Sequence, residues 1–307
     1  PAMTTLDLRA PARSQWLALA DALRIHQWVK NLLVLVPVLL DHKVSDPAVV
    51  LKALIAFAAF CFAASGAYIM NDLFDHRADR HHPTKRHRPF AAETLSRPFG
   101  ALMVPLLFAA ALLCSMWLAP KFVMLLTLYV VLTTAYSVLL KRVAVLDVLL
   151  LAGLYSLRVL AGVAATHVRF STWLLAFSMF LFLSLAFLKR YAELSQLREG
   201  AEESVARRGY LRGDREWLAS MGGSSGYISV LVLALYINSD QVIALYHRPL
   251  LLWLICPLLL LWISRMWLLA HRGRIHQDPI VAAVRDPASY GIGTLVALIM
   301  YVAAYPL

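Results

Sequence analysis

The chain has 307 residues, of which 61% are hydrophobic and only 15% are charged. About a quarter of the residues of a soluble globular domain are charged, so this composition excludes an ordinary soluble protein and indicates an integral membrane protein. The net charge of +11 does not indicate nucleic-acid binding, because the basic residues lie in short segments between apolar runs. The three cysteines lie in separate apolar runs without paired spacing, as small buried residues do.

Nine apolar segments are candidates to cross a bilayer, at about twenty residues per crossing. They are expected at residues 27–41, 48–73, 97–118, 121–140, 144–165, 171–189, 217–237, 248–270 and 287–305. The first is short, and residues 15–26 before it are expected to form an amphipathic helix at the membrane surface. We therefore predict an all-α membrane protein with a flexible segment at residues 1–14. Residues 15–307 then form one bundle of nine transmembrane helices.

The distribution of lysine and arginine predicts the orientation of these spans. One set of connecting segments carries twenty-two of the 29 basic residues, the opposite set carries five, and Arg158 and Arg265 lie within spans. By the positive-inside rule, the N-terminus and the richer loops, 74–97 and 189–216 among them, are cytoplasmic. The C-terminus is expected on the outer side.

An acidic cluster stands at the end of the second apolar segment. Asn71, Asp75 and Asp79 are spaced four residues apart, so on a helix each is rotated by only about 40° from the last and all share one face. Oxygen ligands on one face suit Mg²⁺, which prefers a few carboxylates plus substrate phosphates, and Mn²⁺ is an acceptable substitute. We predict these three residues as metal ligands, with Asp75 and Asp79 catalytic and Asp72 at the substrate. The alternative is a helix end with solvated charges.

A basic run follows the acidic cluster within a few residues. Lys85, Arg86 and Arg88 are expected to hold the phosphate oxygens of the ligand that the metal bridges. The alternative is an ordinary cytoplasmic loop that contacts anionic lipid head groups.

The pattern Asn-Asp-x-x-Asp-x-x-x-Asp, followed by a Thr-Lys-Arg-x-Arg-Pro loop, resembles the first aspartate-rich motif of the UbiA-type intramembrane prenyltransferase superfamily. The resemblance extends over residues 20–305. It implies nine spans with two aspartate-rich loops on the cytoplasmic side, which agrees with the topology predicted above, and an active-site cavity that faces the cytoplasm. It also implies a divalent metal that binds a diphosphate.

The second loop departs from this family pattern. Typical members carry a second aspartate-rich motif after the sixth span, whereas this chain has Lys189, Arg190, Tyr191 and a single acid, Glu193. Two adjacent cations suit a ligand with a further phosphate away from its diphosphate, and 5-phosphoribosyl 1-diphosphate is such a ligand. The alternative is a basic collar at a helix end.

This departure, together with the sequence of residues 24–31, is similar to the decaprenyl-phosphate phosphoribosyltransferase branch. That resemblance implies transfer of 5-phosphoribose from phosphoribosyl diphosphate to a polyprenyl phosphate in a bacterial inner membrane. Lys189 and Arg190 would hold the 5-phosphate, and Tyr191 or Glu193 the ribose hydroxyls. Lys30 would face a substrate phosphate, or else extend to the membrane surface. Membrane lipids are the other expected partners; nucleic acid is not expected, and a homo-oligomer is compatible with the sequence.

Arg158 lies near the middle of the fifth apolar segment. A central arginine costs about 3 kcal/mol on insertion scales, so it is expected to face a polar partner or cavity. Asp147 is one candidate partner, but eleven residues of helix separate the two by about 16 Å. We therefore predict Arg158 as a catalytic residue in the wall of the substrate cavity. Asp278 and Asp286 each precede a proline and are interpreted as helix starts.

Three other functions are open at this stage. A prenyltransferase acting on an aromatic or quinone precursor would have the same fold, but the second loop lacks its acid cluster. A cation transporter would place carboxylates near the bilayer midplane. A structural scaffold would leave Arg158 and the acidic cluster unexplained.

Overall fold

The computed structural model describes residues 15–80, 85–169, 171–196, 209–275 and 278–305, and the predicted flexible segment 1–14 lies outside these ranges. Every element of secondary structure in them is a helix. The α-helices are α1 Gln15–Leu23, α2 Val36–Leu40, α3 Pro47–Arg80, α4 Arg97–Ser115, α5 Pro120–Val138, α6 Leu146–Thr166, α7 Thr172–Ser195, α8 Arg215–Ile237, α9 Asp240–Leu245, α10 Ile255–His271, α11 Pro279–Arg285 and α12 Pro287–Ala304. The 3₁₀ segments are η1 Ile25–Val34, η2 Lys43–Ser45, η3 Lys85–His87, η4 Leu140–Arg142, η5 Arg212–Asp214 and η6 Pro249–Leu254.

Nine of the described helical stretches are long and apolar enough to cross a membrane. They are Gln15–Leu40, Pro47–Arg80, Arg97–Ser115, Pro120–Val138, Leu146–Thr166, Thr172–Ser195, Arg212–Ile237, Pro249–His271 and Pro287–Ala304. This confirms the predicted all-α fold with nine spans. The second span differs most from its prediction, because α3 is one helix of 34 residues that continues past residue 73 to Arg80. The acidic cluster is therefore part of the helix, as its spacing requires.

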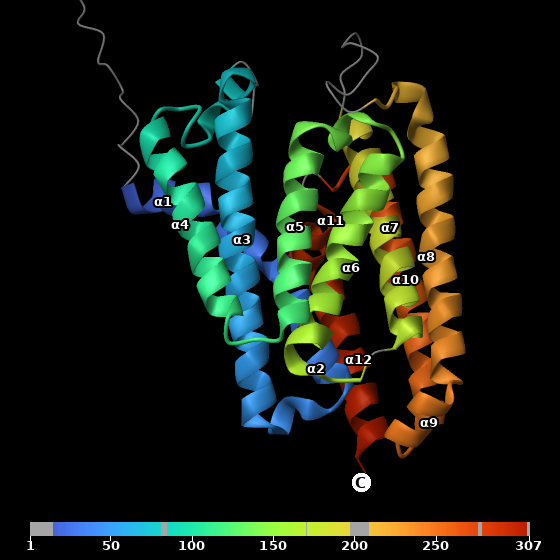
Figure 1. The fold of residues 1–307 in the computed structure, drawn as a ribbon. Coiled ribbons are helices and arrows are strands. Elements are labelled where there is room, and N and C mark those ends of the chain that lie inside the picture. The colour runs from blue at the N-terminus through green and yellow to red at the C-terminus, as the bar shows by residue number, and fades with distance from the viewer. Residues whose placement is uncertain (1–14, 81–84, 170, 197–208, 276–277, 306–307) are drawn as a thin grey trace, which may run out of the picture.

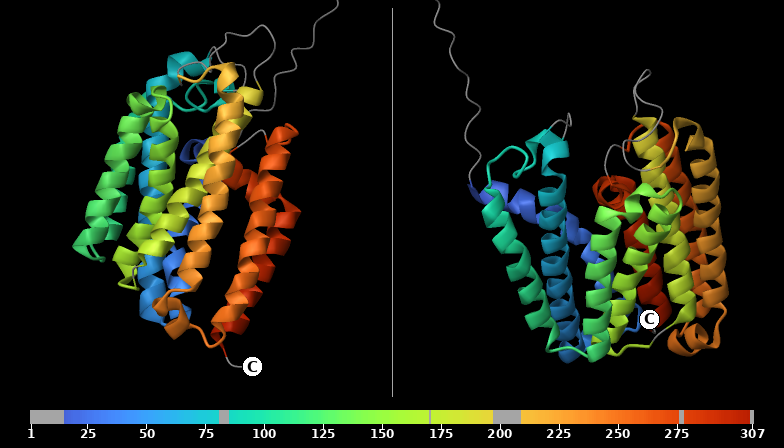
Figure 2. Two further views of the ribbon diagram at one scale, coloured as in Figure 1. Left: turned by 90° about the vertical axis from the view of Figure 1, so that its right-hand side faces the viewer. Right: turned by 45° about the horizontal axis from the view of Figure 1, so that its top comes forward.

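The spans run alternately up and down, so α3, α5, α7 and α10 all end at the same end of the bundle (Figure 1). We call this the motif end, because α3 carries the acidic cluster there. The helix ends that border the loops predicted to share one side of the membrane lie at this end, and the described C-terminus lies at the other. In the two views of Figure 2, α3 and α4 form one side of the bundle and α7, α8 and α10 the other.

The first span is broken into three pieces. Arg24, with φ of 51° and ψ of 48°, is in the left-handed conformation and separates α1 from η1. Helix α1 lies across the long helices, whereas η1 enters the bundle and packs against α3 and α6 (Figure 1). The exposed Trp16 and Leu17 on α1, opposite the buried Ala18 and Ala22, give the amphipathic pattern predicted for residues 15–26.

A glycine allows η1 and α6 to approach each other closely. A Cβ atom on Gly162 of α6 would lie 2.1 Å from the backbone oxygen of Val34, at the end of η1. This contact fixes how deeply η1 enters beside α6. Since η1 carries Lys30 and Asn31, the same contact sets the position of two polar residues in the bundle.

Candidate active site

The acidic cluster occupies the last three turns of α3. Asp72 and Asp79 are both buried, at 2% and 3% exposure, and Asn71 and Asp75 are half-buried. Seven residues correspond to almost two full turns, so Asp72 and Asp79 point nearly the same way, with Asp75 between them along the helix. Asp72, predicted at the substrate and not as a metal ligand, therefore lies on the same side of the helix as Asp79.

Two arginines neutralise this pair of aspartates. Arg24 Nη2 donates to Asp72 Oδ1 at 2.6 Å, and Arg88 Nη1 donates both to Asp72 Oδ1 at 3.1 Å and to Asp79 Oδ2 at 2.8 Å. Arg88 comes from the loop after α3, which folds back onto the helix. The left-handed conformation of Arg24 ends α1 there, and its side chain binds Asp72.

Asp75 has a different partner. Lys141 of η4, in the connection between α5 and α6, donates to Asp75 Oδ2 at 3.1 Å. The lysine side chain is 14% exposed and the aspartate side chain 23%, so the pair is only partly accessible to water. Each of these three aspartates therefore has a basic partner. We call Asp72, Asp75 and Asp79, together with Arg24, Arg88 and Lys141, the aspartate cluster.

The remaining residues of the predicted basic run are less closely tied to α3. Arg86 is exposed, and its Nε lies 3.3 Å from Nε2 of His87. The side chain of Lys85 lies outside the described part of the chain. Predicted phosphate binding by these two residues stays a prediction.

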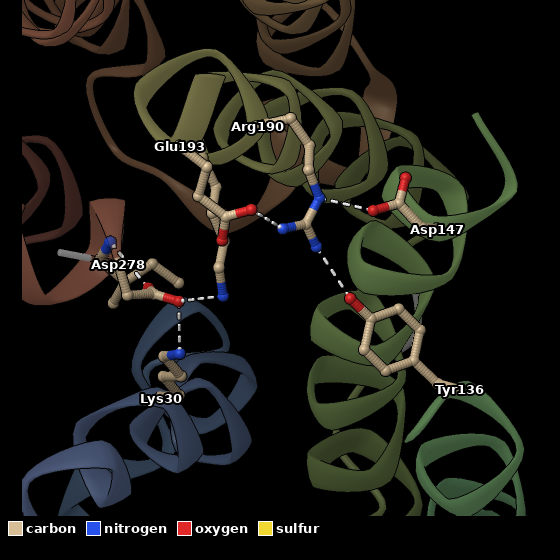
Figure 3. A network of polar contacts seen from close by, with 8 residues as sticks. Lys30, Tyr136, Asp147, Arg190, Glu193 and Asp278 are labelled. Atoms are coloured by element: carbon tan, nitrogen blue, oxygen red, sulfur yellow. Dashed lines mark hydrogen bonds and ion pairs between the residues drawn. The ribbon is translucent and has the colours of Figure 1, made fainter. Parts of the chain in front are cut away.

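A second charged group forms where η1, α7 and the start of α11 meet (Figure 3). Lys30 Nζ and Lys189 Nζ both donate to Oδ2 of Asp278, at 2.7 and 2.9 Å. Burial by itself would raise the pKa of Asp278, but the two ammonium groups outweigh it and hold that pKa well below its usual range. The carboxylate is thus a stable anion between two cations. We call Lys30 and Lys189 the lysine pair.

Arg190 points away from the lysine pair into a buried network (Figure 3). Its guanidinium donates to Asp147, to Glu193 and to the hydroxyl of Tyr136. The side chains of Arg190 and Asp147 are 1% and 0% exposed. In this arrangement, Arg190 joins α5, α6 and α7 and sets the position of Glu193.

Tyr191 faces α10. Its hydroxyl lies 3.1 Å from Nδ1 of His271, and its ring packs at 5.8 Å against that of Trp267. The described contacts of Tyr191 are thus with α10, and its predicted contact with a ribose hydroxyl stays a prediction.

Arg158 is buried in the middle of α6, at 5% exposure. It donates to Asn31 Oδ1 and to the hydroxyl of Tyr129, both at 2.9 Å, and its guanidinium lies 4.7 Å from the centre of the Tyr129 ring. Asp147 is bound by Arg190 instead, in agreement with the separation expected from the sequence. The arginine thus connects α6 to α5 and to η1, and its partner in η1, Asn31, directly follows Lys30.

The sequence resembles known proteins over most of its length. The family model of the UbiA prenyltransferase family matches residues 33–283. The chain belongs to this family. It is similar in fold to a UbiA homologue from Archaeoglobus fulgidus solved with GPP and Mg²⁺, with a TM-score of 0.70 and 15% identity, covering 94% of this chain and 99% of that one.

Curated relatives are more similar in sequence. The chain is 40% identical to the uncharacterised protein y4nM of Sinorhizobium fredii over 90% of its own length, but spans only 54% of that relative. It is 37% identical to the nodulation protein NoeC of Azorhizobium caulinodans, over 91% of this chain and 90% of NoeC. It is also 38% identical to the decaprenyl-phosphate phosphoribosyltransferase of Mycolicibacterium smegmatis, over 62% of this chain and 60% of the relative.

The aspartate cluster of this UbiA-family chain has suitable donors for a divalent metal. No group of three or more acidic, histidine or cysteine side chains in the described ranges converges as a ready metal site. However, the available atoms are carboxylate and amide oxygens, which suit Mg²⁺, and Asp75 and Asp79 contact side-chain cations, Lys141 and Arg88. A metal with a phosphorylated ligand can replace those cations, so Asn71, Asp75 and Asp79 fit Mg²⁺.

Sequence reasoning missed four residues of the site. Asp278 is a helix start as predicted, since its Oδ1 accepts from the backbone N of Ile280 at 3.2 Å, but it also binds the lysine pair. In the sequence, Lys141 contributes to the prediction of topology and Arg24 to the resemblance at residues 24–31. Asp147 is considered there only as a candidate partner of Arg158. Their common signal is an ionisable residue at or inside a span, which normally requires a partner.

Proposed function

We propose that the protein transfers 5-phosphoribose from 5-phosphoribosyl 1-diphosphate to a polyprenyl phosphate and releases diphosphate. The observation that carries the proposal is the lysine pair, in which Lys189, from the segment where the family pattern has a second set of acids, lies beside Lys30 around one carboxylate. The relative named decaprenyl-phosphate phosphoribosyltransferase supports it at 38% identity. The longer matches to y4nM and NoeC name no reaction.

The aspartate cluster is assigned to the diphosphate of the donor. Mg²⁺, held by Asn71, Asp75 and Asp79, would neutralise the charge that develops on the departing diphosphate. Arg88 already contacts two of the aspartates, so it is close enough to share a bridging phosphate with them. Lys85 and Arg86 are assigned to the outer phosphate oxygens, and Asp72 holds Arg24 and Arg88 in place.

The lysine pair is assigned to the second phosphate of the donor. Lys189 is the more exposed of the two, at 26% of its side chain, and is therefore the expected first contact. Buried Arg190 orients Glu193, which is assigned to the ribose hydroxyls, and Tyr191 borders that position. Arg158 is assigned to positioning, because it holds Asn31 beside Lys30.

The reaction then needs no obligatory general base. The acceptor phosphate is already ionised, and one of its oxygens attacks the anomeric carbon of ribose. The bond from that carbon to the diphosphate oxygen breaks, and the electron pair leaves with the diphosphate. Much of the rate is expected from holding two mutually repelling phosphorylated reactants in contact.

The test is to incubate the purified protein with Mg²⁺, a polyprenyl phosphate and phosphoribosyl diphosphate labelled in the ribose. Label is expected in the lipid phase only when the acceptor is present. The rival reaction is prenyl transfer to an aromatic or quinone precursor, which the family description and the GPP-bound homologue favour. Prenyl transfer is supported instead if the label stays in the aqueous phase while a prenyl diphosphate is consumed.

A further inference from the structure

The lysine pair shares one acid. Lys30 Nζ and Lys189 Nζ bind the same oxygen of Asp278, at 2.7 and 2.9 Å. The side chains of Lys30 and Asp278 are each only 8% exposed. Taken by themselves, these two cations and one carboxylate carry one positive charge in excess, in a place where water screens little.

The three residues belong to three separate parts of the bundle. Lys30 comes from η1, Lys189 from α7 and Asp278 from the residue before α11. Lys30 lies in η1, which packs against α3 and α6, and Lys189 lies in the 24-residue helix α7, whereas Asp278 stands at the start of a helix of seven residues. The acid is therefore the member of the group that can most readily move away.

A phosphate monoester can neutralise the lysine pair as Asp278 does, and more completely. It carries a charge of about −1.5 to −2 near pH 7 and has three acceptor oxygens. It would neutralise both lysines, whereas Asp278 neutralises only one equivalent of charge. A neutral sugar hydroxyl cannot replace the carboxylate, because it would leave two cations uncompensated.

We propose that Asp278 is an internal substitute for a substrate phosphate monoester, and that it leaves the lysine pair when that phosphate binds. The identification of the monoester as the 5-phosphate of the donor depends on the function proposed above. Asp278 thereby acts as a specificity-determining residue, since only a ligand more anionic than a carboxylate displaces it. It also keeps the lysines paired before the substrate arrives.

A second aspartate provides a matched control. Asp286 also precedes a proline and also begins a helix, α12, but it pairs with Arg265, whose side chain is 40% exposed. It has no described contact with the lysine pair. Asp278→Asn and Asp286→Asn therefore make the same chemical change at two helix starts, and only the first removes the internal anion.

The experiment measures binding of ribose 5-phosphate to the purified full chain by calorimetry, without metal. Asp278→Asn is expected to bind about tenfold more tightly than the parent protein, because the competing charge is gone. Asp286→Asn should bind as the parent does. Adding Lys189→Met to Asp278→Asn should abolish the gain. If Asp278→Asn does not fold, Asp278→Ser serves in its place, since serine also caps a helix without a charge.

Weaker or unchanged binding in the neutral variants would overturn the inference and return Asp278 to a purely structural role. Inorganic phosphate, used as a second probe, separates this result from failure of the proposed function. If Asp278→Asn gains affinity for inorganic phosphate while no protein binds ribose 5-phosphate, the internal anion stands and the ribosyl donor is wrong.

Discussion

The aspartate cluster and the lysine pair have opposite arrangements of charge at the motif end. In the cluster, three carboxylates of one helix are neutralised by basic residues from three other segments, α1–η1, η3–α4 and η4. In the lysine pair, cations from two spans share one acid from the start of α11. In the function proposed above, the first region would exchange its cations for a metal and the second its anion for a phosphate.

The difference has a functional consequence. A ligand with a metal-bound diphosphate at one end and a phosphate at the other would match both regions, whereas a prenyl diphosphate would use only the first. Changes in the cluster should therefore affect the chemical step, and changes at the lysine pair should affect donor binding. The predictions below test this division.

The largest effect is expected from Asp75→Asn. The change keeps the size of the side chain but removes the carboxylate assigned to the metal, so kcat should fall by about a hundredfold or more. The ribose-transfer assay measures it. Glu216→Gln, an exposed change on the first turn of α8, is the control and should leave kcat unaltered. Near-normal turnover of Asp75→Asn would remove Asp75 from the metal site.

Arg158→Met should be the most destabilising of these changes. It leaves Asn31 and Tyr129 without their buried partner, at a cost of about 2–4 kcal/mol. Arg265→Met is the matched control, because Arg265 also lies within a span but its side chain is 40% exposed, so its pair with Asp286 contributes little to stability. Thermal unfolding in detergent should show a much larger fall in Tm for Arg158→Met. Equal falls in Tm for the two variants would contradict the stabilising role assigned to the contacts of Arg158 with Asn31 and Tyr129.

These two arginines also show what the sequence can and cannot predict. Periodicity and hydropathy predicted nine spans, and a spacing of four predicted that the acidic residues share a helix face. Both predictions depend only on residues that are close in sequence, and both follow from helix geometry. The contact of Arg158 with Asn31 was not predictable, because Asn31 comes from η1, 127 residues away, and because Asp147, the obvious acid, binds Arg190.

The same limit applies to the lysine pair. Lys30, Lys189 and Asp278 are far apart in sequence, and Asp278 lies 248 residues from Lys30. The sequence identified both lysines through a resemblance and identified Asp278 as a helix start. Their meeting depends on how α11 packs against both η1 and α7, which no local pattern encodes. Arg190 illustrates the reverse case, since it adjoins Lys189 but points into a buried network.

Lys189→Ala should separate the two regions kinetically. Removal of the more exposed lysine should raise KM for the donor by about tenfold, with a smaller change in kcat, because the aspartate cluster is intact. Lys121→Ala, an exposed change at the first turn of α5 and at the opposite end of the bundle, should alter neither constant. A fall in kcat with unchanged KM would join Lys189 to the chemical step and break the division.

Gly162→Ala tests whether the lysine pair depends on the close packing of η1 against α6. The added Cβ would meet the backbone oxygen of Val34 at 2.1 Å, and backbone cannot rotate away as a side chain can. We expect a loss of about 1–3 kcal/mol from overpacking. The shift of η1 should also raise KM for the donor while the Mg²⁺ dependence of kcat stays the same. Gly153→Ala on the same helix has no neighbour within 4 Å and should retain both stability and KM. If the two variants behave alike, Gly162 does not set the position of Lys30, and the lysine pair is held by its ion pairs alone.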